Sequence, residues 1–244
     1  PMTAVHMVNV ADECLNRNMN ITNLVNDKLG CTSVSTPGIV GQTLDLYTVD
    51  LTIVRDKDSL YVTMPPYLAL FGMNSGIAFC TNHLAAPVQQ GTPVSHMRRE
   101  LLRKYTIEDA LAYLIKTPKS TSVNFLIADA DRTIDVEATP AKTIVHRVVR
   151  HEEKAYLAHT NHVVQKDIEN DRACPRLTRA FEMLATGQPI KEILSDNRIF
   201  MPIIPYQDTG VGFGSLIQVI MDVKKGTLTY KDPFMKSYET LRLK

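Results

Sequence analysis

The pattern of hydrophobic and polar positions divides the chain at residue 31. Residues 1–30 are polar and rich in asparagine, and their apolar side chains recur irregularly, so we expect a short helix or two and then a turn that ends at Gly30. From residue 31 onward, short apolar and β-branched runs alternate with turn residues, which is typical of strands. The pattern predicts a leader or pro-segment over 1–30 and a single folded domain over 31–244.

Turn residues and helical spacing predict the elements of this domain. Thr36-Pro37-Gly38 predicts a hairpin turn, and Thr106 predicts the N-cap of a helix that Pro118 ends. Strands are expected in the segment 31–54 and over 60–63, 76–81, 124–128, 133–138, 142–149, 155–159, 215–222 and 227–231. Helices are expected over 94–105, 107–117, 172–186 and 188–194.

The order of these elements indicates the fold class. Runs of strands are separated from runs of helices, which favours an α+β fold with antiparallel sheets over an alternating α/β fold. The hairpin turns also favour antiparallel pairing. Helices on the outer faces of such sheets would give a layered sandwich.

Composition excludes two kinds of partner. The 27 Lys and Arg residues balance 26 Asp and Glu residues, so no cationic excess predicts binding to nucleic acid through phosphate contacts. No uninterrupted apolar run is long enough to span a membrane, and the first residues carry no signal-peptide pattern. We therefore expect a cytoplasmic protein that acts on a small molecule; the sequence gives no signal for a homo-oligomer.

The cysteines predict free thiols rather than disulfides or a metal site. The four are Cys14, Cys31, Cys80 and Cys174. They form no CxxC pair and no Cys/His ligand spacing, and a chain of this length does not need disulfides. Cys80 lies in an apolar strand, so we expect it in the core. Cys174 lies in a polar stretch, so we expect it to be an exposed thiol without a function.

Cys31 has two interpretations. Free cysteine is among the most buried residue types, so a structural cysteine at the start of a strand is the simpler one. In the other, cleavage of the Gly30–Cys31 bond makes Cys31 N-terminal. Its α-amino group would then have an ordinary pKa of about 8, low enough to serve as general base for the thiol without a histidine.

Such a nucleophile needs an oxyanion donor and a group that holds the amine. Asn161 offers a side-chain NH₂ for the first purpose, and Asp45 offers a carboxylate for the second. Taken singly, each is as well explained as a capping amide or a turn carboxylate. A Cys–His pair between Cys31 and His159 or His162 is the alternative that needs no cleavage. The sequence carries no GxSxG, P-loop, HExxH or dinucleotide-binding glycine motif.

Several motifs in order resemble those of a known family. They are GCTS at 30–33, GQTLD at 41–45, GMNSGIA at 72–78 and HTNH at 159–162. The segments 93–114, 122–129 and 215–222 are similar as well. The chain thereby resembles the acyl-coenzyme A:6-aminopenicillanate (isopenicillin N) acyltransferase family of the N-terminal-nucleophile hydrolases, from Cys31 to about Asp232.

The resemblance implies a fold and a set of roles. The fold would be a four-layer αββα sandwich of two antiparallel sheets, with the catalytic domain over 31–244. Self-cleavage between Gly30 and Cys31 would release the nucleophile and leave a two-chain form of one precursor. Asp45 would orient the amine or the substrate, and Asn161 would line the oxyanion hole. Residues expected to support the site or bind substrate are Gln42, Thr43, Asn82, His159 and His162.

The chain departs from the family pattern in some places. Only thirty residues precede Cys31, fewer than family precursors usually carry. Thr43 stands where related amidases usually have Asn. Val211-Gly212-Phe213 stands where penicillin-forming enzymes have an arginine before the last long strand, which argues against penicillin chemistry.

We therefore expect an autoproteolytic amidohydrolase or acyltransferase that opens a small amide or thioester through a Cys31 thioester. No cofactor is expected, although a coenzyme A thioester is a candidate acyl donor. Choloylglycine-hydrolase-like and ceramidase-like amidases are alternatives with the same chemistry, and a catalytically silent binding domain on the same fold is an alternative of another class. Arg98, Arg99 and Arg103 are most simply a solvated helix face, with a coenzyme A phosphate as the weaker assignment.

Overall fold

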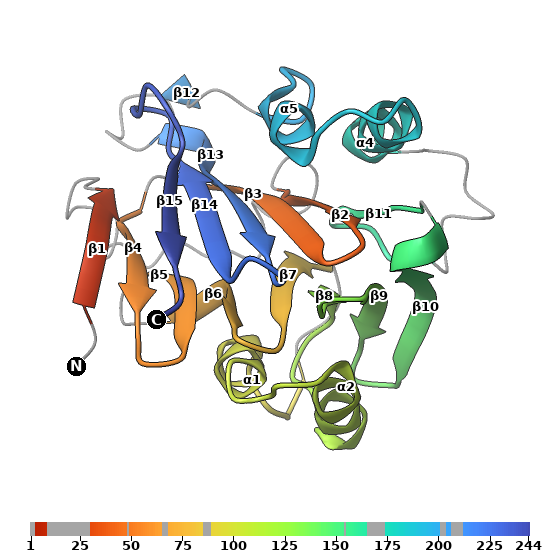
Figure 1. Cartoon of the computed structure of the whole chain (residues 1–244). Helices are drawn as coiled ribbons and strands as arrows, with labels where there is room; N and C mark the ends of the chain where they lie inside the picture. The colour runs from red at the N-terminus through yellow and green to blue at the C-terminus, as the bar shows by residue number, and fades with distance from the viewer. Residues whose placement is uncertain are drawn as a thin grey trace.

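Two antiparallel sheets packed face to face form the centre of the computed structural model (Figure 1). Helices α4 (Pro175–Ala185) and α5 (Ile190–Ser195) lie over one sheet, and α1 (Val94–Leu101) and α2 (Ile107–Lys116) lie under the other. The structure describes residues 3–8, 30–47, 49–64, 68–84, 89–153, 155–164, 174–200, 204–205 and 212–244. These layers confirm the expected α+β sandwich.

The sheet next to α1 and α2 runs in the order β1-β4-β5-β6-β7-β8-β9-β10, with each neighbouring pair antiparallel. Its strands are β1 (Thr3–Val8), β4 (Leu51–Arg55), β5 (Ser59–Met64), β6 (Leu68–Asn74), β7 (Ala78–His83), β8 (Val123–Ala128), β9 (Arg132–Ala138) and β10 (Thr143–Arg150). A single 3₁₀ turn, His151–Glu153, follows β10. Sequence-adjacent strands are neighbours from β4 to β10. The connections are short except between β7 and β8, where α1 and α2 intervene.

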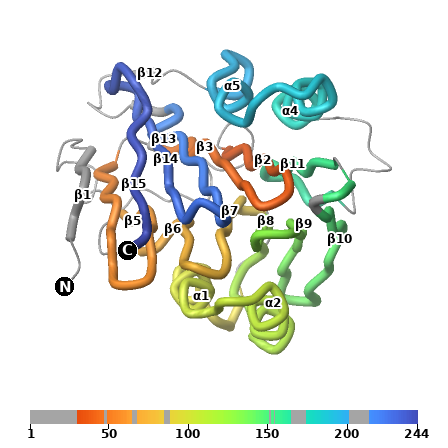
Figure 2. The backbone as a smooth tube through the Cα atoms, viewed as in Figure 1, coloured from red at the N-terminus to blue at the C-terminus, as the bar shows by residue number. Residues whose placement is uncertain are grey.

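The second sheet joins the start of the domain to its end. Its order is β11-β2-β3-β13-β14-β15, with β12 beside β13. Its strands are β2 (Thr32–Thr36), β3 (Ile39–Tyr47), β11 (Leu157–His159), β12 (Ile204–Pro205), β13 (Gly212–Asp222), β14 (Thr227–Lys231) and β15 (Glu239–Arg242). Figure 2 shows β3 beside the C-terminal β13, so Cys31 at the start of β2 is surrounded by segments that are distant in sequence.

Two apolar cores hold the layers together. The larger lies around the eight-stranded sheet and includes the fully buried side chains of Phe71, Phe79 and Phe125. The smaller includes Val34 of β2 and Ile193 of α5, and it fixes α4 and α5 on the other sheet. Burial of apolar side chains at about 25 cal/mol per Å² is the main stabilising contribution at both interfaces.

Most predicted elements are confirmed, with shifted ends. The turn at 36–38 joins β2 to β3, and the Thr106 hydroxyl accepts a hydrogen bond from the Asp109 N–H at 3.1 Å as the N-cap of α2. The first helix ends at Leu101 rather than at residue 105. The strands β1, β6, β12 and β15 were not predicted, and Thr3–Val8 is a strand paired with β4 where a helix was expected. Apart from Gly30, the rest of the predicted leader, with Cys14, lies outside the described residues. None of the described helices has the length and apolar character needed to cross a membrane.

Candidate active site

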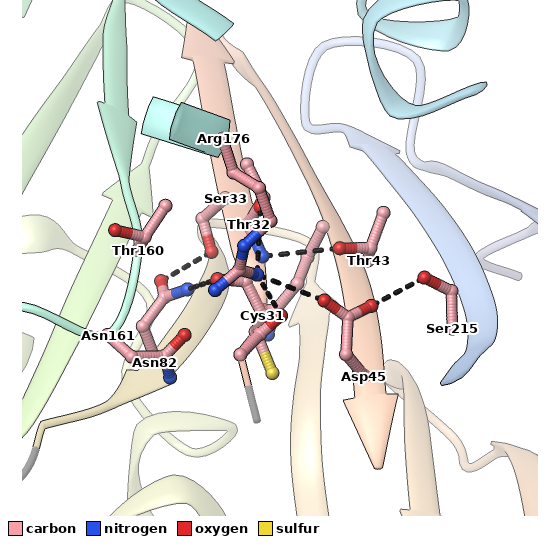
Figure 3. A network of polar contacts seen from close by, with 12 residues as sticks. Cys31, Thr32, Ser33, Thr43, Asp45, Asn82, Thr160, Asn161, Arg176 and Ser215 are labelled. Atoms are coloured by element: carbon pink, nitrogen blue, oxygen red, sulfur yellow. Dashed lines mark hydrogen bonds and ion pairs between the residues drawn. The ribbon is translucent and has the colours of Figure 1, made fainter. Parts of the chain in front are cut away.

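Cys31 lies directly before β2, where the two sheets face each other. In Figure 3 it lies between Asp45 and Ser215 on one side and Asn82 and Asn161 on the other. The guanidinium of Arg176 lies next to it. These side chains come from β3, β13, β7, the segment after β11, and the first turn of α4. The fold therefore brings together Cys31, Asp45 and Asn161, the three residues that the sequence selects as catalytic.

The Cys31 thiol is half-buried and free. Burial and the negative charge of Asp45 raise its pKa, while a hydrogen bond with the Asp45 backbone, the charge of Arg176 and the Gln42 side chain lower it by a smaller amount. The net pKa is above the ordinary value, so the thiol of the uncut chain is neutral at pH 7. A base is needed before it can act as a nucleophile.

Asp45 is buried, and both of its carboxylate oxygens accept hydrogen bonds. The Ser215 hydroxyl donates to Oδ1 at 2.6 Å, and Arg176 Nη1 lies 3.0 Å from Oδ2. Burial raises the pKa of Asp45 to about 6, against the hydrogen bond from Ser215, the charge of Arg176 and the hydroxyl of Thr43. At pH 7 Asp45 is therefore a carboxylate paired with the Arg176 guanidinium. In mildly acidic solution, below about pH 6, most of it is protonated.

Gly30 packs against the site without room for a side chain. Arg176 Nη1 donates to the Gly30 carbonyl oxygen. A Cβ built on Gly30 would overlap Arg176 Nη2 and would lie 2.5 Å from Asn161 Oδ1, closer than atoms approach without displacement. The carbonyl that precedes Cys31 thus faces a cation, and only glycine fits at this position without moving the site.

Asn82 and Thr43 fix the backbone around Cys31. Asn82 Nδ2 donates to the Cys31 carbonyl at 2.9 Å, and the Ser33 hydroxyl donates to Asn82 Oδ1 at 2.6 Å. The Thr32 N–H donates to Thr43 Oγ1 at 3.2 Å. Both residues were expected to support the site, and these contacts place them around the peptide group that joins Cys31 to Thr32.

Gln42 connects the two sheets beside the thiol. Its Nε2 donates to the Thr81 carbonyl at 2.6 Å, and its Oε1 accepts from the Thr81 N–H at 2.8 Å. The same side chain interacts with Cys31 and lowers the pKa of its thiol. Gln42 therefore fixes β3 against β7 at the level of the nucleophile.

Asn161 reaches the Gly30–Cys31 bond from the segment that follows β11. Its Nδ2 donates to the His83 carbonyl at 2.9 Å, and its Oδ1 is buried without a hydrogen-bond partner among the described residues. Because Asn161 Oδ1 faces the space beside Gly30, the amide lies next to the peptide bond that the sequence predicts to be cleaved. It has the chemistry to stabilise an oxyanion, because an amide NH₂ offers two donors and only one is used by His83.

The two histidines beside Asn161 do not form a Cys–His pair. His159 is fully buried, with Nδ1 2.6 Å from the Thr160 carbonyl and Nε2 3.1 Å from Glu137 Oε1. His162 Nδ1 lies 3.4 Å from the Thr160 hydroxyl. Both ring nitrogens of His159 are thus occupied, and no described histidine is among the groups that shift the pKa of Cys31.

Two site residues were missed by the sequence analysis. Arg176 and Ser215 both contact Asp45, from 131 and 170 residues further along the chain. Arg176 occupies a polar stretch after Pro175 and has no local signal. It supplies a guanidinium to Asp45 and to the Gly30 carbonyl.

Two expectations are wrong. Cys174 is buried rather than exposed. Arg98 is not part of a solvated face, because its Nε is buried without a hydrogen-bond partner in the described part of the chain. Burial lowers the pKa of Arg98 to about 10, against the opposing effect of Cys31. Within the described ranges no group of three or more His, Cys, Asp or Glu side chains has the geometry of a metal site.

One known protein family matches more than half of this sequence. The sequence model of the family described as acyl-coenzyme A:6-aminopenicillanic acid acyl-transferase matches residues 50–184, a segment that holds Asn82, Asn161 and Arg176 and begins after Cys31 and Asp45. No curated protein matches the chain in a sequence search.

Solved structures resemble it at low identity. A conjugated bile acid hydrolase from Clostridium perfringens is similar with a TM-score of 0.61 and 13% identity, over 87% of this chain and 92% of the other. Penicillin V acylase from Agrobacterium tumefaciens is similar with a TM-score of 0.58 and 13% identity, over 87% and 86%. At this identity the likeness establishes the four-layer fold that the site is built on, and the roles of the residues rest on their own geometry.

Proposed function

Since the chain belongs to the acyl-coenzyme A:6-aminopenicillanic acid acyl-transferase family, we propose that it is a self-processing cysteine enzyme that hydrolyses or transfers the acyl group of a small amide or thioester. The family and the fold support chemistry on carbon–nitrogen bonds. The observation that carries the proposal is the hydrogen bond from Arg176 Nη1 to the Gly30 carbonyl, the carbonyl of the peptide bond that precedes Cys31.

The first step is cleavage of the chain itself. Cys31 Sγ attacks the Gly30 carbonyl carbon, the peptide C–N bond breaks, and a thioester joins Gly30 to Sγ. Water then hydrolyses the thioester, which leaves a Gly30 carboxylate and a free Cys31 thiol and α-amine. Asp45, the carboxylate whose charge acts most strongly on the thiol, takes the thiol proton and gives it to the Cys31 nitrogen as the C–N bond breaks. Arg176 donates to the oxygen on which negative charge develops.

The second step is turnover of an external substrate. The free α-amine takes the proton of the thiol, and Sγ attacks the substrate carbonyl to give a thioester acyl-enzyme. The Asn161 NH₂, with a backbone N–H, stabilises the oxyanion. The amine returns its proton to the leaving group, and either water or a second amine takes the acyl group from Cys31.

The similarity to a bile acid hydrolase and a penicillin acylase favours an amide substrate opened by water. Choloylglycine-hydrolase-like and ceramidase-like amidases would use the same steps, and a coenzyme A thioester would enter as acyl donor in the transferase form. A silent binding domain on the same fold would keep the Gly30–Cys31 bond.

The N-terminal residue and intact mass of the purified protein test the proposal. We expect a chain that begins at Cys31 and acquires one acyl group from a thiol-directed activated ester. An intact Gly30–Cys31 bond together with no acylation of Cys31 would instead establish the binding domain.

The pH dependence of self-cleavage is predicted from Asp45. Precursor refolded by dilution from denaturant is expected to cut with a rate that rises through about pH 6, where Asp45 loses its proton, and then levels off. Below that value the protonated acid neither accepts the thiol proton nor pairs with Arg176, so the rate falls about tenfold per pH unit. A rate that climbs steadily from pH 5 to pH 9 would contradict a role for Asp45 and point to simple ionisation of the thiol.

A further inference from the structure

A buried ion pair lies behind Asn161 and connects the two sheets. Glu137 belongs to β9 of the eight-stranded sheet, and His159 ends β11 of the other. His159 Nε2 lies 3.1 Å from Glu137 Oε1, and the two side chains are 0% and 1% exposed. Burial of two charges costs free energy that their attraction only partly returns, so the pair is not explained by stability alone.

The geometry fixes the protonation state of His159. Nδ1 faces the Thr160 carbonyl oxygen at 2.6 Å, and Nε2 faces a carboxylate oxygen. Both partners only accept hydrogen bonds, and a neutral imidazole has one N–H, so the ring satisfies both only as the imidazolium. Burial lowers the pKa of His159, but the hydrogen bond to Glu137 and the charge of Asp135 outweigh it and raise the pKa above the ordinary value.

The pair holds both ends of the segment that carries Asn161. At one end His159 Nδ1 donates to the Thr160 carbonyl. At the other end the Val164 N–H donates to Glu137 Oε1 at 2.8 Å. The same carboxylate oxygen therefore contacts His159 and Val164, and Asn161 lies between these two points.

Two further titratable groups face the pair. His146 Nε2 on β10 lies 2.8 Å from Glu137 Oε2, the oxygen that His159 does not contact. Asp135, two residues before Glu137 on β9, accepts a hydrogen bond from Asn124 Nδ2, and burial raises its pKa. Hydrogen bonds from His159 and Val164, together with the nearby His146, overcome burial at Glu137 and lower its pKa, which keeps it a carboxylate.

We infer that Glu137 and His159 are positioning residues that set the Asn161 amide at the oxyanion. Neither contacts Cys31, so they act on the reaction only through the 160–164 segment. The inference rests on the proposed function of Asn161. A misplacement of about 1 Å in such a donor costs about 100-fold in rate, which makes the pair's effect measurable.

Two probes of Cys31 separate positioning from general damage. p-Nitrophenyl acetate transfers its acetyl group to Sγ with loss of p-nitrophenolate and passes through an oxyanion. Iodoacetamide alkylates Sγ with loss of iodide and forms none. Both reactions are followed by intact mass on the fragment that begins at Cys31, so chains cut at the same bond are compared.

Glu137→Gln keeps the shape but gives His159 no charge to pair with. Its acylation rate relative to wild type is expected to be about 30-fold lower at pH 8, where neutral His159 can only accept at Nε2 from the new amide NH₂, which turns the amide oxygen away from the Val164 N–H. At pH 5.5, where the imidazolium persists and donates to the amide oxygen, the rate is expected to be within about threefold of wild type. Alkylation is expected within about twofold of wild type at both pH values.

His159→Gln cannot donate to two opposite sides and is expected to lose acylation at every pH. The exposed Glu182→Gln serves as the matched control for Glu137→Gln.

The outcomes distinguish failure of the positioning role from failure of the proposed function. An acylation ratio that is unchanged, or that falls together with alkylation and without pH dependence, overturns the positioning role while leaving the proposed function in place. A wild-type Cys31 that reacts with iodoacetamide but never with the ester overturns both. If Glu137→Gln does not fold, Glu137→Asp keeps the charge on a shorter side chain and is expected to show a partial loss of acylation.

Discussion

Cys31→Ala is expected to purify as one uncut chain of 27.3 kDa, whereas the wild-type protein is expected to be cut after Gly30. Alanine fills most of the space of the half-buried cysteine but has no sulfur to attack the Gly30 carbonyl. The contacts that hold this carbonyl and the next peptide group come from Arg176 and Asn82, and the substitution leaves them intact. The fold is therefore expected to persist, with the reaction stopped before its first bond forms. Intact mass and N-terminal sequencing measure the result.

A second substitution and a matched control sharpen this test. Cys31→Ser is expected to remain uncut as well, because a hydroxyl is a far weaker nucleophile than a thiol at this pH. Cys174→Ala removes another buried thiol, at the N-cap of α4, and is expected to cut like wild type. If the Cys31 variants were cut at the same bond as wild type, self-processing by Cys31 would be ruled out.

Local signals explain what the sequence predicted of the fold. Gly38 and Gly226 adopt positive φ of 80° and 59° in the turns that join β2 to β3 and β13 to β14, a conformation that glycine takes without strain. β6 was missed because Leu68–Asn74 is buried on both faces and shows no polar alternation. β15 was missed for the opposite reason: it is a mostly exposed edge strand with little apolar pattern.

In the site as well, residues close together in the sequence were predicted, whereas partners from distant segments were not. Cys31 and Asp45 come from one hairpin, and their residue types suggested a nucleophile and a carboxylate partner. The partners that give Asp45 its charge state are Arg176 and Ser215, which the fold brings in from other elements. Arg176 lies in a polar stretch with no distinguishing pattern, and Ser215 was predicted only as the first residue of a strand, so only the packed structure identifies them as partners of Asp45.

Arg176→Met is expected to slow self-cleavage by about 100-fold to 1000-fold, since the developing oxyanion at Gly30 loses its charged donor. It is also expected to lower the free energy of unfolding by about 3 kcal/mol, because the buried Asp45 carboxylate loses its cation and keeps only neutral hydrogen-bond donors. Denaturant unfolding and the rate of appearance of the Cys31 terminus measure the two effects. Arg179→Met, one turn further along α4 and paired with Asp196, is the control expected to cut normally.

The double variant Arg176→Met/Asp45→Asn separates the two roles of the guanidinium. Removing the carboxylate along with the cation leaves no unpaired charge, and the introduced amide oxygen still accepts the Ser215 hydrogen bond, so most of the lost stability is expected to return. Self-cleavage is expected to stay as slow as in Arg176→Met or slower, because the donor to Gly30 and the acid–base group are both gone. Recovery of cleavage together with stability would mean that Arg176 only neutralises Asp45. A double variant that is stable again but still cuts no faster than Arg176→Met would show that the slow cleavage of Arg176→Met is not a consequence of its lost stability.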